Sequence, residues 1–150
     1  MGEIILAYTH ILGIFIVVIS LFVENMVITK EMTIKELKRL TKADSWYGLG
    51  AIVMLITGFA RIYLVGKGSD YYWSHPLFLI KLGIFTVSGL LSIYPTIQFI
   101  KLSKKLKVEG ATEFTWRESS KFKLIALLQL GLILTLPFLA NMIARGIGYS

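Results

Sequence analysis

Cysteine is absent from this chain of 150 residues, and histidine occurs only as His10 and His75. Without thiolates the chain can form neither disulfides nor iron–sulfur clusters, and it can neither attach a c-type haem nor attack a substrate through sulfur. Two histidines are too few for an all-histidine zinc or copper site within one chain. The methionines are scattered, which argues against a series of thioether ligands for copper. Copper handling is therefore the weakest of the functions considered below.

Charged residues are also scarce: they make up 17% of the chain, against about a quarter in a soluble domain. The apolar residues fall into four blocks, at about residues 4–28, 45–65, 77–100 and 122–143. Each block is long enough to cross a hydrocarbon core ~30 Å thick as an α-helix, which takes roughly 20 residues. The sequence therefore predicts an all-α integral membrane protein, a four-helix bundle that forms a single domain over residues 1–150.

Positive charge is concentrated in two of the three connections between these blocks. The basic residues of the first and third connections are Lys30, Lys35, Lys38, Arg39, Lys42, Lys101, Lys104, Lys105, Lys107, Arg117, Lys121 and Lys123. The second connection has only Lys67, and no basic residue precedes the first block. Because Lys and Arg accumulate in cytoplasmic loops, both termini should lie on the outer side of a bacterial inner (cytoplasmic) membrane. The same rule accounts for the net charge of +7, so we expect neither a nucleic-acid partner nor a cleaved signal peptide.

The inner connections contain signals for helix ends. Thr33 with Glu36, and Thr115 with Glu118, have the spacing of capping boxes. The first box should begin a short amphipathic helix on the inner membrane surface, and the second should begin the fourth span. Gly110 should end the inward extension of the third span.

Aromatic residues and glycines give further expectations for packing. Trp46, Tyr47 and Trp116 should lie at the inner membrane interface, where amphipathic rings are enriched. Six glycines should be positions of close helix packing. They are Gly48, Gly50, Gly58, Gly83, Gly89 and Gly131.

Polar groups from all four spans lie at one depth near the outer face. His10 lies roughly 9 Å below the outer end of the first span, and Lys81 ~7 Å below that of the third. Arg61 and Asn141 lie at a comparable depth in the second and fourth spans, with Arg145 just above. The spans contain no carboxylate at this level. Uncompensated positive charge inside a bundle indicates an anionic ligand.

Haem b suits this chemistry. The His10 imidazole would bind the haem iron, and Lys81, Arg61, Asn141 and Arg145 would contact the propionates or an anionic substrate. Lys81 and Arg61 are accordingly the candidate catalytic cations. A second axial ligand could come only from His75; otherwise the haem has a single histidine, with Lys81 as a weak sixth ligand. The alternatives are a hydrogen bond from His10 to a neighbouring helix, and extension of Arg61 and Lys81 to lipid phosphates.

A second polar group lies near the inner face. Asp44 directly precedes the second apolar block and should cap that helix. Glu24 and Asn25 lie within the first block. Glu24 should pair with a basic residue of the inner connections; the less favoured alternative is one end of a proton path.

These residues resemble a bacterial family of predicted four-helix membrane proteins of unknown function. The resemblance extends over nearly the whole chain, and its most specific part is Ser92-Ile93-Tyr94-Pro95-Thr96. The other matching runs are Ala7-Tyr8-Thr9-His10, Asp44 to Gly48, Gly58 to Arg61, Gly66-Lys67-Gly68, Tyr71-Tyr72 and Lys81. More distantly, the chain is similar to HemJ-type protoporphyrinogen IX oxidases, which have a histidine in helix one and a lysine early in helix three. That resemblance implies haem ligation by His10 and contact of Lys81 with haem or substrate.

Two functions follow from these observations. In the first, the chain is a haem b membrane protein that oxidises a porphyrinogen or passes electrons to a quinone. In the second, it is a non-enzymatic membrane subunit or small transporter whose basic outer level binds an anionic solute or lipid. Four helices are few for a transporter, so the second function would require a homo-oligomer.

Overall fold

The computed structural model describes residues 1–65, 67–110 and 112–148, so Gly66 lies outside the described residues. Four long helices, α1 (Gly2–Val27), α2 (Ile34–Leu64), α4 (Pro76–Glu109) and α5 (Ser119–Ala144), are joined by shorter elements. These are the helix α3 (Ser69–Ser74) and the strands β1 (Glu31–Thr33) and β2 (Glu113–Thr115). All four long helices are long and apolar enough to cross a membrane. The predicted all-α fold with four spans is therefore confirmed.

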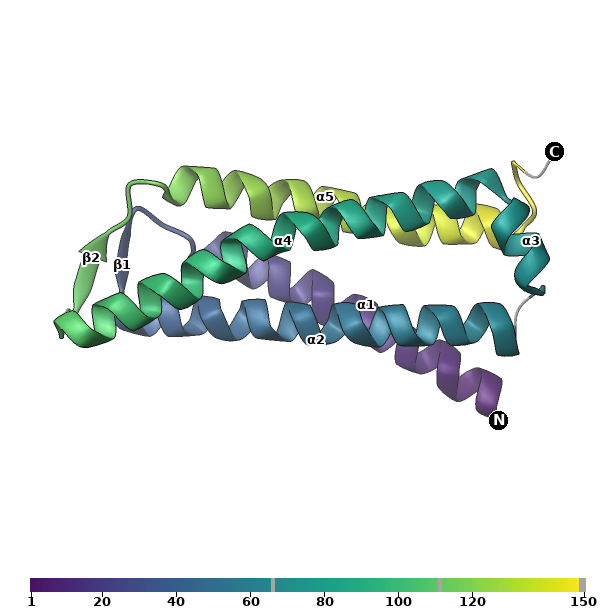
Figure 1. The fold of residues 1–150 in the computed structure, drawn as a ribbon, viewed down its shortest axis with the longest axis horizontal. Coiled ribbons are helices and arrows are strands. Elements are labelled where there is room, and N and C mark those ends of the chain that lie inside the picture. Colours follow the sequence, from purple (N-terminus) through teal and green to yellow (C-terminus); the bar gives the residue numbers. More distant parts are fainter. Residues whose placement is uncertain (66, 111, 149–150) are drawn as a thin grey trace.

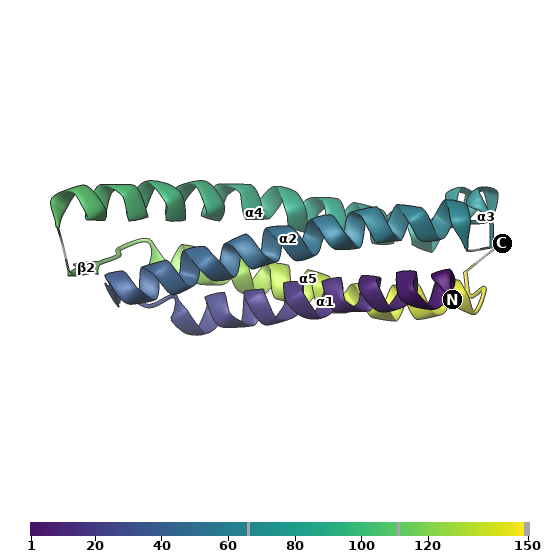
Figure 2. The ribbon, with the colours of Figure 1, turned by 90° about the horizontal axis from the view of Figure 1, so that it is seen from below.

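The long helices form an elongated bundle in which α1 packs mainly against α2, and α4 against α5 (Figure 1). Both termini and α3 lie at one end, here called the α3 end, and β1 and β2 lie at the other, the sheet end. Figure 2 shows the same arrangement from below. Large apolar side chains such as Ile52, Leu90 and Leu128 are exposed along the outside of the helices. An apolar exterior of this kind is suited to contact with lipid, as expected of a protein associated with the bilayer.

Two glycines allow α1 and α2 to approach closely. A Cβ atom at Gly50 would lie 2.9 Å from side-chain carbons of both Ile16 and Val17. A Cβ at Gly13 would lie 2.9 Å from Met54 Cγ and 3.3 Å from the Gly50 carbonyl oxygen. Small residues let helix backbones approach in membranes, where close packing drives association. The expected role is thus confirmed for Gly50, while Gly13 had not been identified from the sequence.

Four of the predicted packing glycines have no such role. A Cβ atom would meet nothing within 4 Å at Gly48, Gly83, Gly89 or Gly131. Gly58 is packed less tightly than Gly50, because a Cβ atom there would lie in ordinary van der Waals contact with the His10 ring, at 3.5 Å.

The capping box at Thr33 is confirmed, but it begins a different helix from the one expected. The Thr33 hydroxyl accepts from the Glu36 N–H, and the Glu36 carboxylate accepts from the Thr33 N–H. The helix that begins there continues without a break to Leu64. No separate surface helix is formed, and Asp44 lies inside α2 and not at its N-cap.

The two basic connections pair as a small antiparallel sheet that the sequence analysis did not predict. Met32 of β1 lies opposite Phe114 of β2. Thr115 is therefore in a strand, and α5 begins only at Ser119, without a side-chain cap. The prediction that Thr115 and Glu118 form a capping box at the start of the fourth span is therefore wrong. Gly110, by contrast, ends α4 in the left-handed conformation, as predicted.

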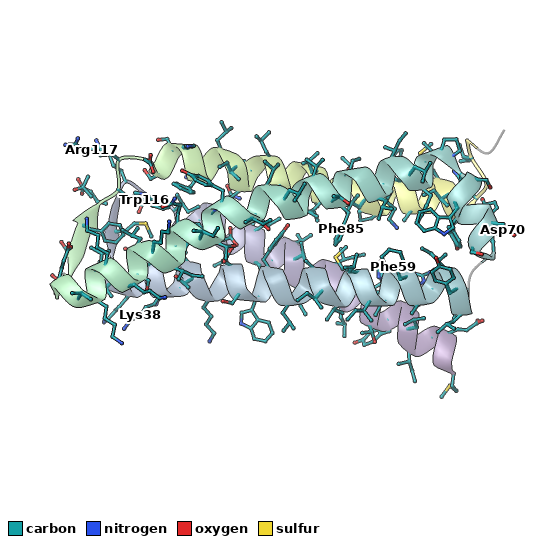
Figure 3. The ribbon with its side chains drawn as sticks, in the orientation of Figure 1. Lys38, Phe59, Asp70, Phe85, Trp116 and Arg117 are labelled. Atoms are coloured by element: carbon teal, nitrogen blue, oxygen red, sulfur yellow. The ribbon has the colours of Figure 1, made fainter. Side chains whose placement is uncertain are left out.

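An apolar cluster fills the bundle near this sheet. This sheet-end cluster consists of Ile28, Met32, Leu37, Leu40, Phe99, Leu106, Trp116, Phe122 and Ala126. The Trp116 ring stacks on Phe122 with 4.6 Å between centroids, and Figure 3 shows it at the sheet end of the bundle, where Lys38 projects outward. Trp116 and Tyr47 are both buried, so neither is the interfacial residue predicted, whereas Trp46 is exposed. The rings are buried because the sheet and the neighbouring ends of α2 and α4 extend the core beyond the apolar blocks.

A second cluster occupies the middle of the bundle. This central cluster consists of Val17, Leu21, Tyr47, Met54, Ile133 and Leu136, with Ile84 and Phe85 packed against it. It includes side chains from all four long helices. The central cluster therefore separates the polar groups of the sheet end from those of the α3 end.

Substitution of Gly50 by Val should lower the thermal stability of the protein in detergent, because the new side chain must displace Ile16 and Val17. Overpacking of this kind costs about 1–3 kcal/mol. Gly131→Val is the matched control: it introduces the same residue into a helix, where a Cβ meets nothing within 4 Å. Equal losses of melting temperature in the two variants would contradict the close approach of α1 and α2.

Candidate ligand-binding cavity

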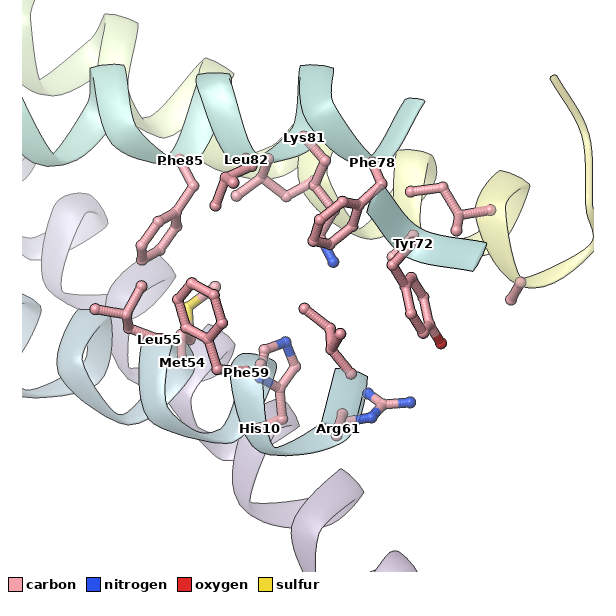
Figure 4. Close-up of a pocket in the computed structure, with 16 residues that line it drawn as sticks. His10, Met54, Leu55, Phe59, Arg61, Tyr72, Phe78, Lys81, Leu82 and Phe85 are labelled. Carbon is pink, nitrogen blue, oxygen red and sulfur yellow. The ribbon is translucent and has the colours of Figure 1, made fainter. Parts of the chain in front are cut away.

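A cavity of about 170 Å³ lies near the α3 end, enclosed by α1, α2, α4 and α5 and bordered by Tyr72 of α3. Its walls are largely aromatic and aliphatic, and include Phe59, Phe78 and Phe85. Figure 4 shows these rings around the cavity. The helix α3 is held over this end because Tyr71 Oη donates to the Ile143 carbonyl oxygen at 2.8 Å.

Three basic side chains from three helices line this cavity: His10 of α1, Arg61 of α2 and Lys81 of α4. In Figure 4 the His10 ring and the Lys81 ammonium group point into the cavity from opposite walls. Lys81 and Arg61 both lie close enough for their charges to act on His10. The structure therefore places together the three residues that the sequence analysis had assigned to one depth.

The His10 ring is held by a hydrogen bond that sets its tautomer. Nδ1 of His10 lies 2.8 Å from Oγ1 of Thr57. The Thr57 hydroxyl has one proton, which it donates to the Val53 carbonyl oxygen at 2.6 Å. Nδ1 therefore carries the ring proton and donates to Thr57, which leaves a lone pair on Nε2. Gly58 has no side chain to separate this ring from α2.

Neither cation of the cavity has an acidic partner among the residues that the structure describes. The one ion pair found there joins Lys105 and Glu109, at the far end of α4. Asp70, the nearest acid in the sequence, lies exposed on α3 and accepts a hydrogen bond from Ser69. The cavity thus combines apolar walls with uncompensated positive charge.

The other predicted site residues are not brought to the cavity. Asn141 and Arg145 are exposed and do not line it. His75 is fully buried where α3 meets α4, with its ring edge-on to Tyr71 at 5.4 Å. Rotation about the helix axis is set by packing, and it turns Asn141 and Arg145 away from the cavity.

The sequence did not identify the apolar walls of the cavity or Thr57, the hydrogen-bond partner of His10. Phe59, Phe78 and Phe85 were not singled out, because aromatic residues are common in any span. Thr57 could have been found, since it lies at the depth of His10 and precedes Gly58, a residue that leaves room for a side chain from a neighbouring helix. No group of three or more metal-ligating side chains occurs in the described part of the chain.

The fold and this cavity define a small four-span α-helical membrane protein with a basic, aromatic-walled site near one end of the bundle. Residues 2–148 match the family model described as Predicted membrane protein (DUF2214), and the chain belongs to that family. No curated protein and no solved structure is similar to it at a significant level. The family description names no activity, so function must be argued from the cavity.

Proposed function

We propose that this protein binds haem b in the cavity and acts as a membrane oxidoreductase. The observation that carries the proposal is the position of His10: its Nδ1–H is fixed on Thr57, and its Nε2 lone pair is available at a cavity with two unpaired cations. A histidine whose other ring nitrogen is held in this way is typical of metal ligands.

The side chains present fit the chemistry of haem. Nε2 of His10 would hold the iron, and Lys81 and Arg61 would pair with the propionates. Phe59, Phe78 and Phe85 provide apolar walls for the macrocycle. Bound there, haem would supply one-electron redox chemistry, with a porphyrinogen as the substrate or a quinone as the electron acceptor.

The enclosed volume limits how a haem could be held. The cavity of about 170 Å³ is smaller than the ~300–1,000 Å³ of typical ligand pockets. Leu55, Phe59 and Arg61 of its α2 wall are exposed. A macrocycle would therefore extend beyond the enclosed space on this side, with Arg61 at the opening.

The same small volume favours a second candidate function. A small anion would fit the space without extending beyond it, and an acyl chain would fit in part and leave through the same opening, with the negative charge in either case on Lys81 and Arg61. The protein would then be a non-enzymatic subunit or small transporter for an anionic lipid or solute, and a homo-oligomer in the transporter case.

We further infer that the α3 end faces the outside of a bacterial cytoplasmic membrane, because the basic connections gather at the sheet end.

Cysteine labelling tests this orientation. The chain has no cysteine, so single cysteines can be introduced without interference. Asp70→Cys at the α3 end should react with a membrane-impermeant maleimide on intact cells or spheroplasts, whereas Ser120→Cys should react only after lysis. Figure 3 shows Asp70 at one end and Arg117, near Ser120, at the other. Labelling of Ser120→Cys alone on intact cells would reverse the orientation.

The haem assignment predicts a coloured protein. The detergent-purified protein should show a Soret band and, after reduction, the pyridine haemochrome of haem b at near-stoichiometric amounts. His10→Ala should lose the pigment while remaining folded, and Thr57→Val should weaken haem affinity by roughly 10–100-fold, the usual effect of losing the hydrogen-bond partner of a metal ligand. Arg145→Gln is the control, since Arg145 does not line the cavity. Full haem content in His10→Ala, or a colourless wild type after growth with haem precursor, would refute the assignment.

The two cations distinguish the candidate functions. Lys81→Met and Arg61→Met should each weaken haem binding by about tenfold or more, because each removes a charge-assisted hydrogen bond worth roughly 1.5–3 kcal/mol. If the wild type is colourless, native mass spectrometry of the same variants becomes decisive. An anionic lipid or solute that remains bound to the wild type and is lost from both variants would establish the second candidate function.

A further inference from the structure

Polar side chains from all four long helices form a layer inside the bundle. This polar layer consists of Glu24, Asp44, Ser88, Thr96, Gln129 and the hydroxyl of Tyr47. Along each helix these residues lie between members of the sheet-end cluster and members of the central cluster. Glu24, for example, lies between Leu21 and Ile28 of α1. The layer is thus closed off by apolar side chains on both sides.

Glu24 is the residue of this layer that lacks a partner. It is 3% exposed, and its Oε1 atom makes no hydrogen bond. Another acid, Asp44, lies close enough for its charge to act on Glu24. Within the described ranges Glu24 forms no ion pair with a basic residue. The expectation from the sequence that Glu24 pairs with the basic connections is therefore wrong.

The hydrogen bonds found within the layer join its other residues. Thr96 Oγ1 lies 2.8 Å from Asp44 Oδ1, and Gln129 Nε2 donates to the Ser88 carbonyl oxygen at 3.0 Å. The Tyr47 hydroxyl lies 3.4 Å from both oxygens of Ser88. None of these contacts reaches Glu24 Oε1.

We propose that Glu24 and Asp44 form a proton-binding site within the membrane, in which the acid pair holds one proton on the Glu24 carboxyl. An ionised carboxylate in this position would be buried without a counter-ion, which costs several kcal/mol. Two neighbouring carboxylates cannot both ionise without strong repulsion, whereas one proton satisfies the unpartnered oxygen and removes that repulsion. The other residues of the layer add no positive charge, since Tyr47 on α2, Ser88 and Thr96 on α4 and Gln129 on α5 are neutral.

This site is independent of the cavity, because the central cluster lies between the two. Carboxyl groups that take up and release protons inside membrane proteins are the usual components of proton relays. A proton held in the layer is therefore a second functional element of the bundle, separate from any ligand of the cavity.

Infrared spectroscopy of the purified protein tests the proposal. At neutral pH the wild type should show the carbonyl stretch of a protonated carboxylic acid, which shifts in D2O. Glu24→Gln should lose this band, and Glu31→Gln, at an exposed position of β1, should keep it. Absence of the band from the wild type, or its persistence in Glu24→Gln, would overturn the proposal, and the wild-type measurement does not depend on a variant that folds.

Thermal stability provides a second readout. Because glutamine has the shape of the protonated acid, Glu24→Gln should melt at or above the wild-type temperature near neutral pH. A proton bound in the folded state and absent from the unfolded state stabilises the protein below the pH at which it is released. The wild-type melting temperature should therefore fall as the pH rises, and this fall should be missing from Glu24→Gln.

A comparison of sodium chloride with choline chloride at equal ionic strength tests for a metal cation. If sodium raises the wild-type melting temperature above its value in choline, and Glu24→Gln abolishes the rise, the site binds a metal cation and the proton assignment is overturned.

Discussion

The close approach of α1 and α2 at Gly13 and Gly50 is the contact on which both polar sites depend. One turn beyond Gly13 towards the α3 end, the face of α1 that packs on α2 presents His10 to Thr57. Three turns in the other direction the same face of α1 presents Glu24. The antiparallel helix α2 places Asp44 close enough for its charge to act on Glu24. A wider spacing between these helices would break the His10 hydrogen bond and let lipid or water reach the carboxyl group. The backbone contact of two small residues thus fixes the chemistry of side chains at both ends of the bundle.

The spans were predictable from the sequence because the bilayer imposes a length and an apolar composition on every helix that crosses it. Gly110 and the capping box of Thr33 were predictable because they act through local backbone geometry. The β1–β2 sheet was not, since each strand has only three residues and pairs with a segment about eighty positions away. Trp116 was misplaced for the same reason: only the sheet and the extended α4 show that the core continues past the apolar block.

At the candidate cavity the sequence predicted depth but not direction. A rise of about 1.5 Å per residue was enough to bring His10, Arg61 and Lys81 to one level. It could not separate them from Asn141 and Arg145, which lie at that level on an exposed side of α5. A helix places neighbouring residues about 100° apart, so helix rotation decides which polar groups converge. That rotation follows from packing among all four helices, which a single sequence does not specify.

The cavity and the polar layer carry uncompensated charges of opposite sign. The cavity contains two cations and a histidine with no acid beside them, whereas the polar layer contains two acids with no cation. They do not neutralise each other, because the apolar central cluster lies between them and an ion pair cannot form across it. In the two proposals each uncompensated charge is met separately, by an anionic ligand at the α3 end and by a proton in the layer. The proposed proton site and the proposed redox ligand lie at different levels of the bundle, which is the arrangement that a proton-coupled electron transfer requires, and neither proposal depends on the other.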